Sequence, residues 1–277
     1  MAGRYGLKVL LVFALLTVLT QVGGIIYLLY QPFSRWIQRQ MGASWRGRVL
    51  RAATFCTLYL AVSAWLVPPL ARRWGRVPLP WKAAAETPLK PRHLFYCLAN
   101  RHYVRPALRE AVIATARLIE RQHPGARLSY LDGNFPFWDG FRLFPHLSHD
   151  DGEKLDLCFL YRKNNSSRLV CRTPSPFGYG AGEGPLSGEI DQPALCARQG
   201  YWQYSLLNKV TPRLHASLNF DEKANRELLL LLNRQPGIGK IFIEPHLKQR
   251  LGLQSIAKVR YHGCQAVRHD DHVHVQI

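Results

Sequence analysis

Apolar residues fill two long uncharged stretches in the first quarter of the chain. Residues 9–30 are dense in Leu, Val and Ile, and residues 52–71 form a second run with two prolines near its end. About 20 apolar residues in a helix cross a hydrocarbon core of roughly 30 Å. A cleaved signal peptide is the alternative for the first stretch, but its apolar core is too long and no small-residue cleavage site follows. The pattern therefore predicts two transmembrane helices, at about 9–30 and 52–71.

Basic residues are concentrated around these two stretches. The net charge is +19, and residues 1–80 hold ten Lys or Arg and no Asp or Glu. Five of these basic residues lie between the two stretches, two lie before them and three lie after them. Because basic loops favour the cytoplasmic side, we expect this loop in the cytoplasm and the long C-terminal part outside.

The charge of the C-terminal part is modest by comparison. Residues 81–277 contain 27 basic and 18 acidic residues, a balance that suits an anionic polymer such as an acidic cell-wall peptide. No nucleic-acid recognition motif accompanies the charge, so we expect no nucleic-acid partner.

Beyond the apolar stretches the pattern changes to short elements. We expect residues 1–77 to form a membrane anchor and residues 78–277 an extracytoplasmic domain, with a Pro- and Ala-rich linker over 77–91. Pro106 opens an amphipathic helix that runs to about Gln122, and Asp221 caps a helix through 228–232. Short apolar strands between such helices predict an α+β fold, with a small antiparallel sheet flanked by helices.

The six cysteines do not form a simple set. No Cys-x-x-Cys pair is present, so we expect no structural zinc knuckle. Asn164-Asn165 predicts a hairpin that would set Cys158 opposite Cys171, where the two thiols could form a cross-strand disulfide. The Gly-rich residues 173–200 have no periodicity, which is typical of a substrate-side flap or of a disordered excursion.

The last residues of the chain carry the strongest chemical signal. His272-Val273-His274-Val275 alternates imidazole and aliphatic side chains, so a strand would place both imidazoles on one face. They could bind one metal ion together, or act as one ligand and one proton shuttle. His269 stands near enough to join them. An expression tag or a solvated end is the alternative, but neither explains valines at a period of two.

A second polar cluster lies near the middle of the chain. A turn at Gly152 leads into an apolar strand that begins near Asp156. A carboxylate buried there without a partner would cost several kcal/mol. A metal ion shared with His149 would be such a partner, although an ion pair with an arginine is the default interpretation of this pattern alone.

Two histidine motifs occur in the order found in a known peptidase family. The first is a His-x-x-His followed by a glycine turn and an aspartate: His146, His149, Gly152 and Asp156. The second is a His-x-x-His-x-His: His269, His272 and His274. With the segment 240–248 they resemble penicillin-insensitive murein endopeptidase, a relative of D-Ala-D-Ala peptidases, lysostaphin-type enzymes and hedgehog domains. The resemblance covers roughly 125–160 and 237–277. The membrane spans depart from that family, whose familiar enzyme is a soluble periplasmic protein.

The resemblance implies a zinc peptidase that cleaves peptide cross-links of peptidoglycan. It would sit in the bacterial inner membrane with its catalytic domain facing the periplasm. Carried over by position, the zinc ligands would be His149, Asp156 and His274. His272 would then be the general base, and His269 would assist it.

The chemistry of these residue types agrees with that assignment. Two imidazoles and one carboxylate leave a fourth zinc position open for water, as in catalytic sites. His146 would orient His149, or be a simple hydrogen-bonded loop histidine. Arg142 or Arg268 could bind a substrate carboxylate, with a solvated surface arginine as the alternative for each. Two other functions stay open: a carboxypeptidase of the same superfamily, and a zinc-stabilised binding module without turnover.

Overall fold

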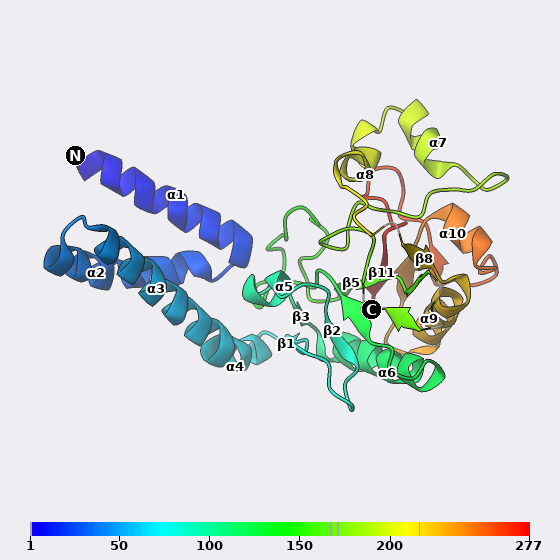
Figure 1. The fold of residues 1–277 in the computed structure, drawn as a ribbon, viewed down its shortest axis with the longest axis horizontal. Coiled ribbons are helices and arrows are strands. Elements are labelled where there is room, and N and C mark those ends of the chain that lie inside the picture. Colours follow the sequence, from blue (N-terminus) through cyan, green and yellow to red (C-terminus); the bar gives the residue numbers. More distant parts are fainter. Residues whose placement is uncertain (1, 165, 167, 171, 216) are drawn as a thin grey trace.

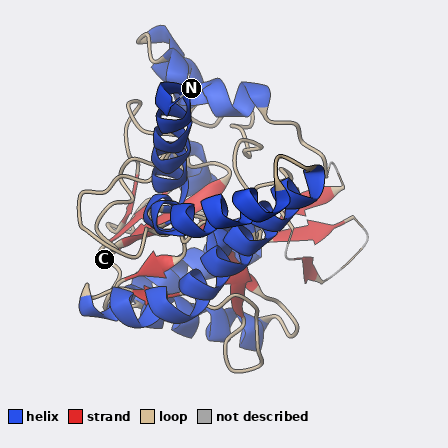
Figure 2. Cartoon of the chain, turned by 90° about the vertical axis from the view of Figure 1, so that its left-hand side faces the viewer, coloured by secondary structure: helices blue, strands red, loops and turns tan. Residues whose placement is uncertain are grey.

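A helical unit projects from one side of an α+β domain in the computed structural model, which describes residues 2–164, 166, 168–170, 172–215 and 217–277 (Figure 1). The unit comprises α1 (Ala2–Thr20), α2 (Gly23–Met41), α3 (Trp45–Ala61), a π-helical turn (Val62–Leu66) and α4 (Val67–Arg73). The N-terminus and the α2–α3 connection lie at its far end, and the α1–α2 junction lies beside the domain. Figure 2, viewed from the side of the helical unit, shows its helices in front of the strands.

The first predicted membrane span is interrupted at Gln21. This residue has a φ of 64°, in the left-handed region, and separates α1 from α2. Gly24 then allows close packing of the two helices, because a Cβ there would lie 2.0 Å from Thr17 Oγ1. The apolar stretch 9–30 therefore forms parts of two helices instead of one.

One helix among the described residues is long and apolar enough to cross a membrane. It runs over Trp45–Arg73, 29 residues including the π-helical turn, and contains the second predicted span at 52–71. The apolar part of α1, Tyr5–Thr20, is shorter. The prediction of two transmembrane helices is therefore wrong, and the structure supports one candidate span.

The described residues of the domain form three β-sheets. The largest has six strands in the order β10 (Val259–Arg260), β9 (Lys240–Phe242), β11 (His272–Gln276), β5 (Lys154–Cys158), β4 (Leu128–Tyr130) and β2 (Leu89–Pro91). A smaller sheet has the strand order β7 (Leu169–Val170), β6 (Tyr161–Lys163) and β8 (Leu218–Phe220). The third sheet consists of β1 (Val77–Pro78) and β3 (Tyr103–Val104). The β10–β9 and β2–β4 pairs are parallel. The α+β class is confirmed, but the large sheet is mixed where we expected an antiparallel one.

The hydrophobic core lies between the large sheet and two helices, α6 (Pro106–Gln122) and α9 (Glu222–Arg234) (Figure 1). Val273 and Val275 of β11 are fully buried in it, and each such side chain stabilises the fold by about 1.5–3 kcal/mol. Successive residues of a strand point to opposite faces, so His272 and His274 lie on the face away from these helices. The predicted helix boundaries at Pro106 and Gln122 are confirmed, and Asp221 caps α9 by accepting from Ala224 N.

The remaining helices are short and lie in the connections. They are α5 (Phe95–Leu98), α7 (Gln192–Arg198), a 3-10 turn (Trp202–Ser205), α8 (Leu206–Val210) and α10 (Pro245–Arg250). The predicted linker over 77–91 is wrong, because this segment supplies β1 and β2 and buries Leu79 and Leu89. The division into a membrane anchor and an extracytoplasmic domain at 77/78 stays a prediction.

A disulfide joins Cys196 of α7 to Cys264, which lies in the connection between β10 and β11. It closes a loop of 68 residues. The predicted partner of Cys158, Cys171, lies outside the described residues. β6 and β7 pair antiparallel, as in a hairpin, but Tyr161 lies opposite Val170 and Arg162 opposite Leu169, a register different from that expected of a two-residue turn at 164–165.

We expect Cys264→Ser to lower the free energy of unfolding by about 2–4 kcal/mol, because the cross-link restricts the unfolded chain. Thermal unfolding of the full chain, with and without a thiol reductant, measures this loss. Cys56→Ser is the matched control, since Cys56 is an exposed free cysteine in the helical unit. Equal unfolding temperatures for the oxidised wild type and Cys264→Ser would contradict the expectation.

Candidate metal centre

The two central strands bring the two predicted motifs together. In the antiparallel β5–β11 pair, Asp156 lies opposite His274, and Cys158 lies opposite His272. Directly opposed residues share one face of a sheet, so the carboxylate meets the imidazole of His274. Asp156 Oδ1 lies 2.9 Å from His274 Nδ1. The last strand, predicted from the alternation of histidine and valine, therefore supplies one half of the site.

A loop between β4 and β5 supplies the other half. His149 Nδ1 is hydrogen-bonded to Gly133 O at 2.8 Å, which turns Nε2 toward Asp156. Glycine suits position 133, because a Cβ there would make tight contacts of 3.2 Å with the carbonyl oxygens of Arg101 and Tyr103. A backbone carbonyl on one ring nitrogen is the usual support of a metal-binding histidine, since it fixes the tautomer that leaves the other nitrogen free.

Three donor atoms converge at this point. His149 Nε2 lies 3.3 Å from Asp156 Oδ1 and 3.2 Å from His274 Nδ1, and the remaining side of the triangle is 2.9 Å. Ligand bonds of about 2.0–2.1 Å in tetrahedral geometry place donors about 3.3 Å apart. All three residues are at most 2% exposed. The donor set and its spacing therefore fit a small divalent cation.

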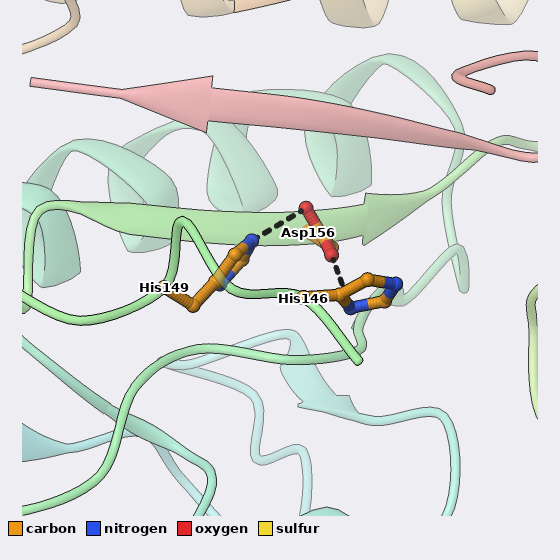
Figure 3. A group of neighbouring side chains, drawn as sticks. All are labelled: His146, His149 and Asp156. Carbon is orange, nitrogen blue, oxygen red and sulfur yellow. Dashed lines mark ion pairs between the residues drawn. The ribbon is translucent and has the colours of Figure 1, made fainter. Parts of the chain in front are cut away.

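His146 approaches the same carboxylate from the other side. Its Nδ1 lies 3.4 Å from Asp156 Oδ2 and 2.9 Å from Asp132 Oδ2. Figure 3 shows His146 and His149 approaching different oxygens of Asp156. The buried group of His146, His149 and Asp156 can hold a metal ion, since one donor atom from each lies within 4.8 Å of the others.

The ionisable groups at and around Asp156 differ in pKa and therefore in charge. Burial alone would raise the pKa of Asp156, but the charges of His149 and His272 outweigh it and hold this pKa well below its usual range. Burial lowers the pKa of His274 to about 4, despite its hydrogen bond to Asp156. Burial also holds the pKa of His269 well below its usual value. His274 and His269 are therefore neutral at pH 7, whereas burial of His149 is outweighed by the charge of Asp156, which raises the pKa of this imidazole. Because neutral imidazole is the form that binds metal ions, His149 would release its proton on binding one.

His272 differs from His274 in both charge and partners. Burial disfavours its charged form, but the carboxylates of Asp156 and Asp271 outweigh burial and raise its pKa to about 9. Its Nδ1 is hydrogen-bonded to Asp271 Oδ1, whereas its buried Nε2 has no hydrogen-bond partner in the part of the chain that the structure describes. An imidazole oriented by a carboxylate on one nitrogen can exchange a proton through the other.

Two residues that the sequence did not single out complete the support of the site. Asp132 forms a bidentate ion pair with Arg101, at 2.7 and 2.8 Å, and also contacts His146. Tyr179 donates to Asp156 Oδ2 at 2.7 Å. Asp132 lies just after the apolar strand β4, and a carboxylate at that position is a signal that the sequence carries. Tyr179 lies in the Gly-rich segment, and no local pattern marks it.

We expect Asp132→Asn to destabilise the chain by about 3–5 kcal/mol at pH 7, because it leaves Arg101 buried without a counter-charge. Burial alone would raise the pKa of Asp132, but Arg101 outweighs it and the pKa is lowered. The stabilisation is therefore present above the usual aspartate pKa of about 3.9 and is lost as the pH falls through the lower folded value.

Thermal unfolding of wild type and Asp132→Asn at pH 7 and at pH 3 measures their difference in stability. This difference should be smaller at pH 3. Asp151→Asn is the control. Its ion pair with Lys154 is partly exposed, and such pairs contribute at most about 1 kcal/mol. A larger difference in stability between wild type and Asp132→Asn at pH 3 than at pH 7 would contradict a stabilising Arg101–Asp132 ion pair.

A cavity of about 240 Å³ opens beside the three donor atoms. Its wall includes every histidine of the two motifs and a further one, His262, whose ring lies 6.0 Å from that of His274. Pro145, Leu147 and Val267 add apolar surface. The cavity leads to the donor atoms. His262 lies shortly after β10, and no motif in the sequence marks it.

The remaining predicted residues are placed as follows. The ring of His269 lies 4.9 Å from that of His272, so it joins the cluster. Arg142 is exposed, and no contact among the described residues links it to the site. Arg268 pairs with Asp270, which removes it as a free carboxylate-binding group.

Comparison with known proteins adds no identification. No protein-family model matches the chain, and no curated protein matches it.

Proposed function

We propose that this chain is a membrane-anchored zinc peptidase that hydrolyses peptide cross-links of peptidoglycan. The observation that carries the proposal is the buried triangle of His149 Nε2, Asp156 Oδ1 and His274 Nδ1, with sides of 2.9–3.3 Å. Two histidines and one carboxylate form the protein part of many catalytic zinc sites, which keep the fourth position for water or substrate. Zinc fits this nitrogen-rich set better than magnesium or calcium, which prefer oxygen ligands.

His274 is the third ligand in this proposal, in preference to His146. The Nδ1 of His146 lies closer to Asp132 than to Asp156, and it approaches the oxygen of Asp156 that points away from His149. His146 and Tyr179 together hold Asp156 Oδ2. This leaves Oδ1 as the single oxygen directed at the two ligand imidazoles.

A zinc ion in such a site acts as a Lewis acid and lowers the pKa of water to near 7. His272 is the proton carrier: Asp271 orients its ring, and its free Nε2 lies 3.7 Å from Asp156 Oδ1, beside the ligands. A cation held by Asp156 would weaken the interaction that raises the pKa of His272 and would so favour the neutral, proton-accepting form of this imidazole. His272 would take a proton from water and return it to the leaving amine, with His269 at its side.

The substrate class rests on the resemblance to penicillin-insensitive murein endopeptidase. Two features support an extracytoplasmic site. The Cys196–Cys264 disulfide is typical of oxidising compartments. The basic residues that flank the α2–α3 connection lie at the end of the helical unit away from the domain (Figure 1), which favours a cytoplasmic position for that end. Both features are consistent with a catalytic domain in the periplasm.

Digestion of purified cross-linked muropeptides by the full chain in detergent tests the proposal. We expect dimers to be converted to monomers, the reaction to stop with a chelator, and added zinc to restore it. Bound zinc without turnover would overturn the enzymatic assignment in favour of a zinc-stabilised binding module. Release of single C-terminal residues instead of monomers would indicate a carboxypeptidase.

A further inference from the structure

The loop that carries two of the site histidines is attached to the helical unit. We define the site loop as residues 133–149. Gln21, at the α1–α2 junction, donates from Nε2 to Phe137 O at 2.7 Å and accepts from Phe137 N at 2.8 Å. Gln21 is fully buried, and Phe137 packs in an apolar cluster with Val22 and Val67 of the helical unit. One side chain thus satisfies both backbone groups of a residue in the site loop.

Arg76, which follows α4, fixes the same loop at two points. It is fully buried, and its guanidinium donates to Phe135 O and Phe137 O near the start of the loop. It also donates to Asp150 O at 3.0 Å, directly after the loop. The side chain of Arg76, just after the helical unit, therefore holds the two ends of the site loop together.

We propose that the helical unit is a structural part of the metal centre, in which Gln21 and Arg76 are positioning residues for the site loop. By holding Phe137 they fix the path of the chain to His149, whose Nε2 must meet Asp156 and His274. Burying an unpaired amide costs several kcal/mol, so the double hydrogen bond also explains a glutamine in an apolar stretch. The proposal rests on the function proposed above, because it concerns the same metal site.

Gln21→Leu tests the proposal in the full chain, because it keeps the size of the side chain and removes both hydrogen bonds to Phe137. Gln31→Leu is the matched control. Gln31 is also a buried glutamine of the helical unit, but its partners, Tyr5 and Tyr27, lie within that unit. If Gln21→Leu does not fold, Gln21→Met is used instead, because it keeps the unbranched shape of the side chain and also lacks both hydrogen bonds.

Hydrogen exchange of residues 133–149 is the first readout and needs no metal. We expect faster exchange of these amides in Gln21→Leu than in wild type, and no change in Gln31→Leu. Exchange at the wild-type rate in Gln21→Leu would overturn the proposal. A fall in unfolding temperature common to both variants does not count as support.

Zinc affinity, measured by competition with a chromophoric chelator, is the second readout. Displacing groups that orient metal ligands costs about 10- to 100-fold in affinity, and we expect a loss of this size in Gln21→Leu only. Wild-type zinc affinity in Gln21→Leu would overturn the link between helical unit and metal centre. Failure of the wild-type chain itself to bind zinc would reject the proposed function, whereas the exchange experiment would still report on the attachment of the loop.

Discussion

His272→Ala is expected to retain zinc and to lower the rate of cross-link cleavage by about 10²- to 10⁴-fold, the usual contribution of a general acid–base group. The imidazole of His272 has an orienting carboxylate and a free nitrogen, but it is not one of the three converging donors. His274→Ala is expected to lose both zinc and activity, because it removes one corner of the donor triangle. Metal content and turnover, measured on the same samples, separate the two roles.

His93→Ala is the control for these substitutions, because His93 is exposed and lies outside the cavity. It should match the wild type in zinc content and rate. Equal loss of zinc in His272→Ala and His274→Ala would mean that the roles are reversed or shared. Full activity in His272→Ala would assign the proton transfer to another group, with His269 as the nearest imidazole of the second motif.

Asp156→Asn is expected to abolish stable zinc binding. Asp156 is the acceptor on which the other groups converge: Oδ1 faces His149 and His274, and Oδ2 faces His146 and Tyr179. An amide brings two N–H donors into this position and removes the only negative charge among the three ligands. The loss should exceed the roughly 10- to 100-fold that is typical of supporting residues.

Zinc titration, monitored by the rise in unfolding temperature, measures the loss of zinc binding in Asp156→Asn. A ligand that binds only the folded state adds about 2.7 kcal/mol of stability at 100 times its Kd. The wild-type chain should gain stability with zinc, and Asp156→Asn should not. Tyr179→Phe removes a single hydrogen bond to the same carboxylate and should show an intermediate gain. A zinc-dependent gain in Asp156→Asn equal to that of the wild type would exclude this carboxylate as a ligand.

The part of the site on β11 could be predicted from the sequence because a strand has a period of two. The alternation of His272 and His274 with valines fixes which side chains share a face, and the burial of Val273 and Val275 confirms it. Asp156 could be predicted as a residue in need of a partner, because it lies within an apolar strand. That His274 is this close partner depends on strand register, which only the structure supplies.

Other parts of the site depend on contacts between distant segments, which no local pattern records. Tyr179 reaches Asp156 from a segment without periodicity, and the Arg101–Asp132 pair joins two connections. Gln21 carries a local signal in the sequence, because this polar amide and the glycines at 23 and 24 interrupt the first apolar stretch. That combination is typical of a break between packed helices, and it explains why a single span over 9–30 was wrong.

X-ray absorption at the zinc edge of the chain reports the ligands of the proposed metal site. We expect about one zinc ion per chain, with two imidazoles and oxygen ligands at about 2.0–2.1 Å. In His274→Ala the zinc signal should be lost. A third imidazole in the wild-type spectrum would place His146 or His272 among the ligands. Sulfur at about 2.3 Å, or a chain without zinc, would contradict a zinc site of His149, Asp156 and His274.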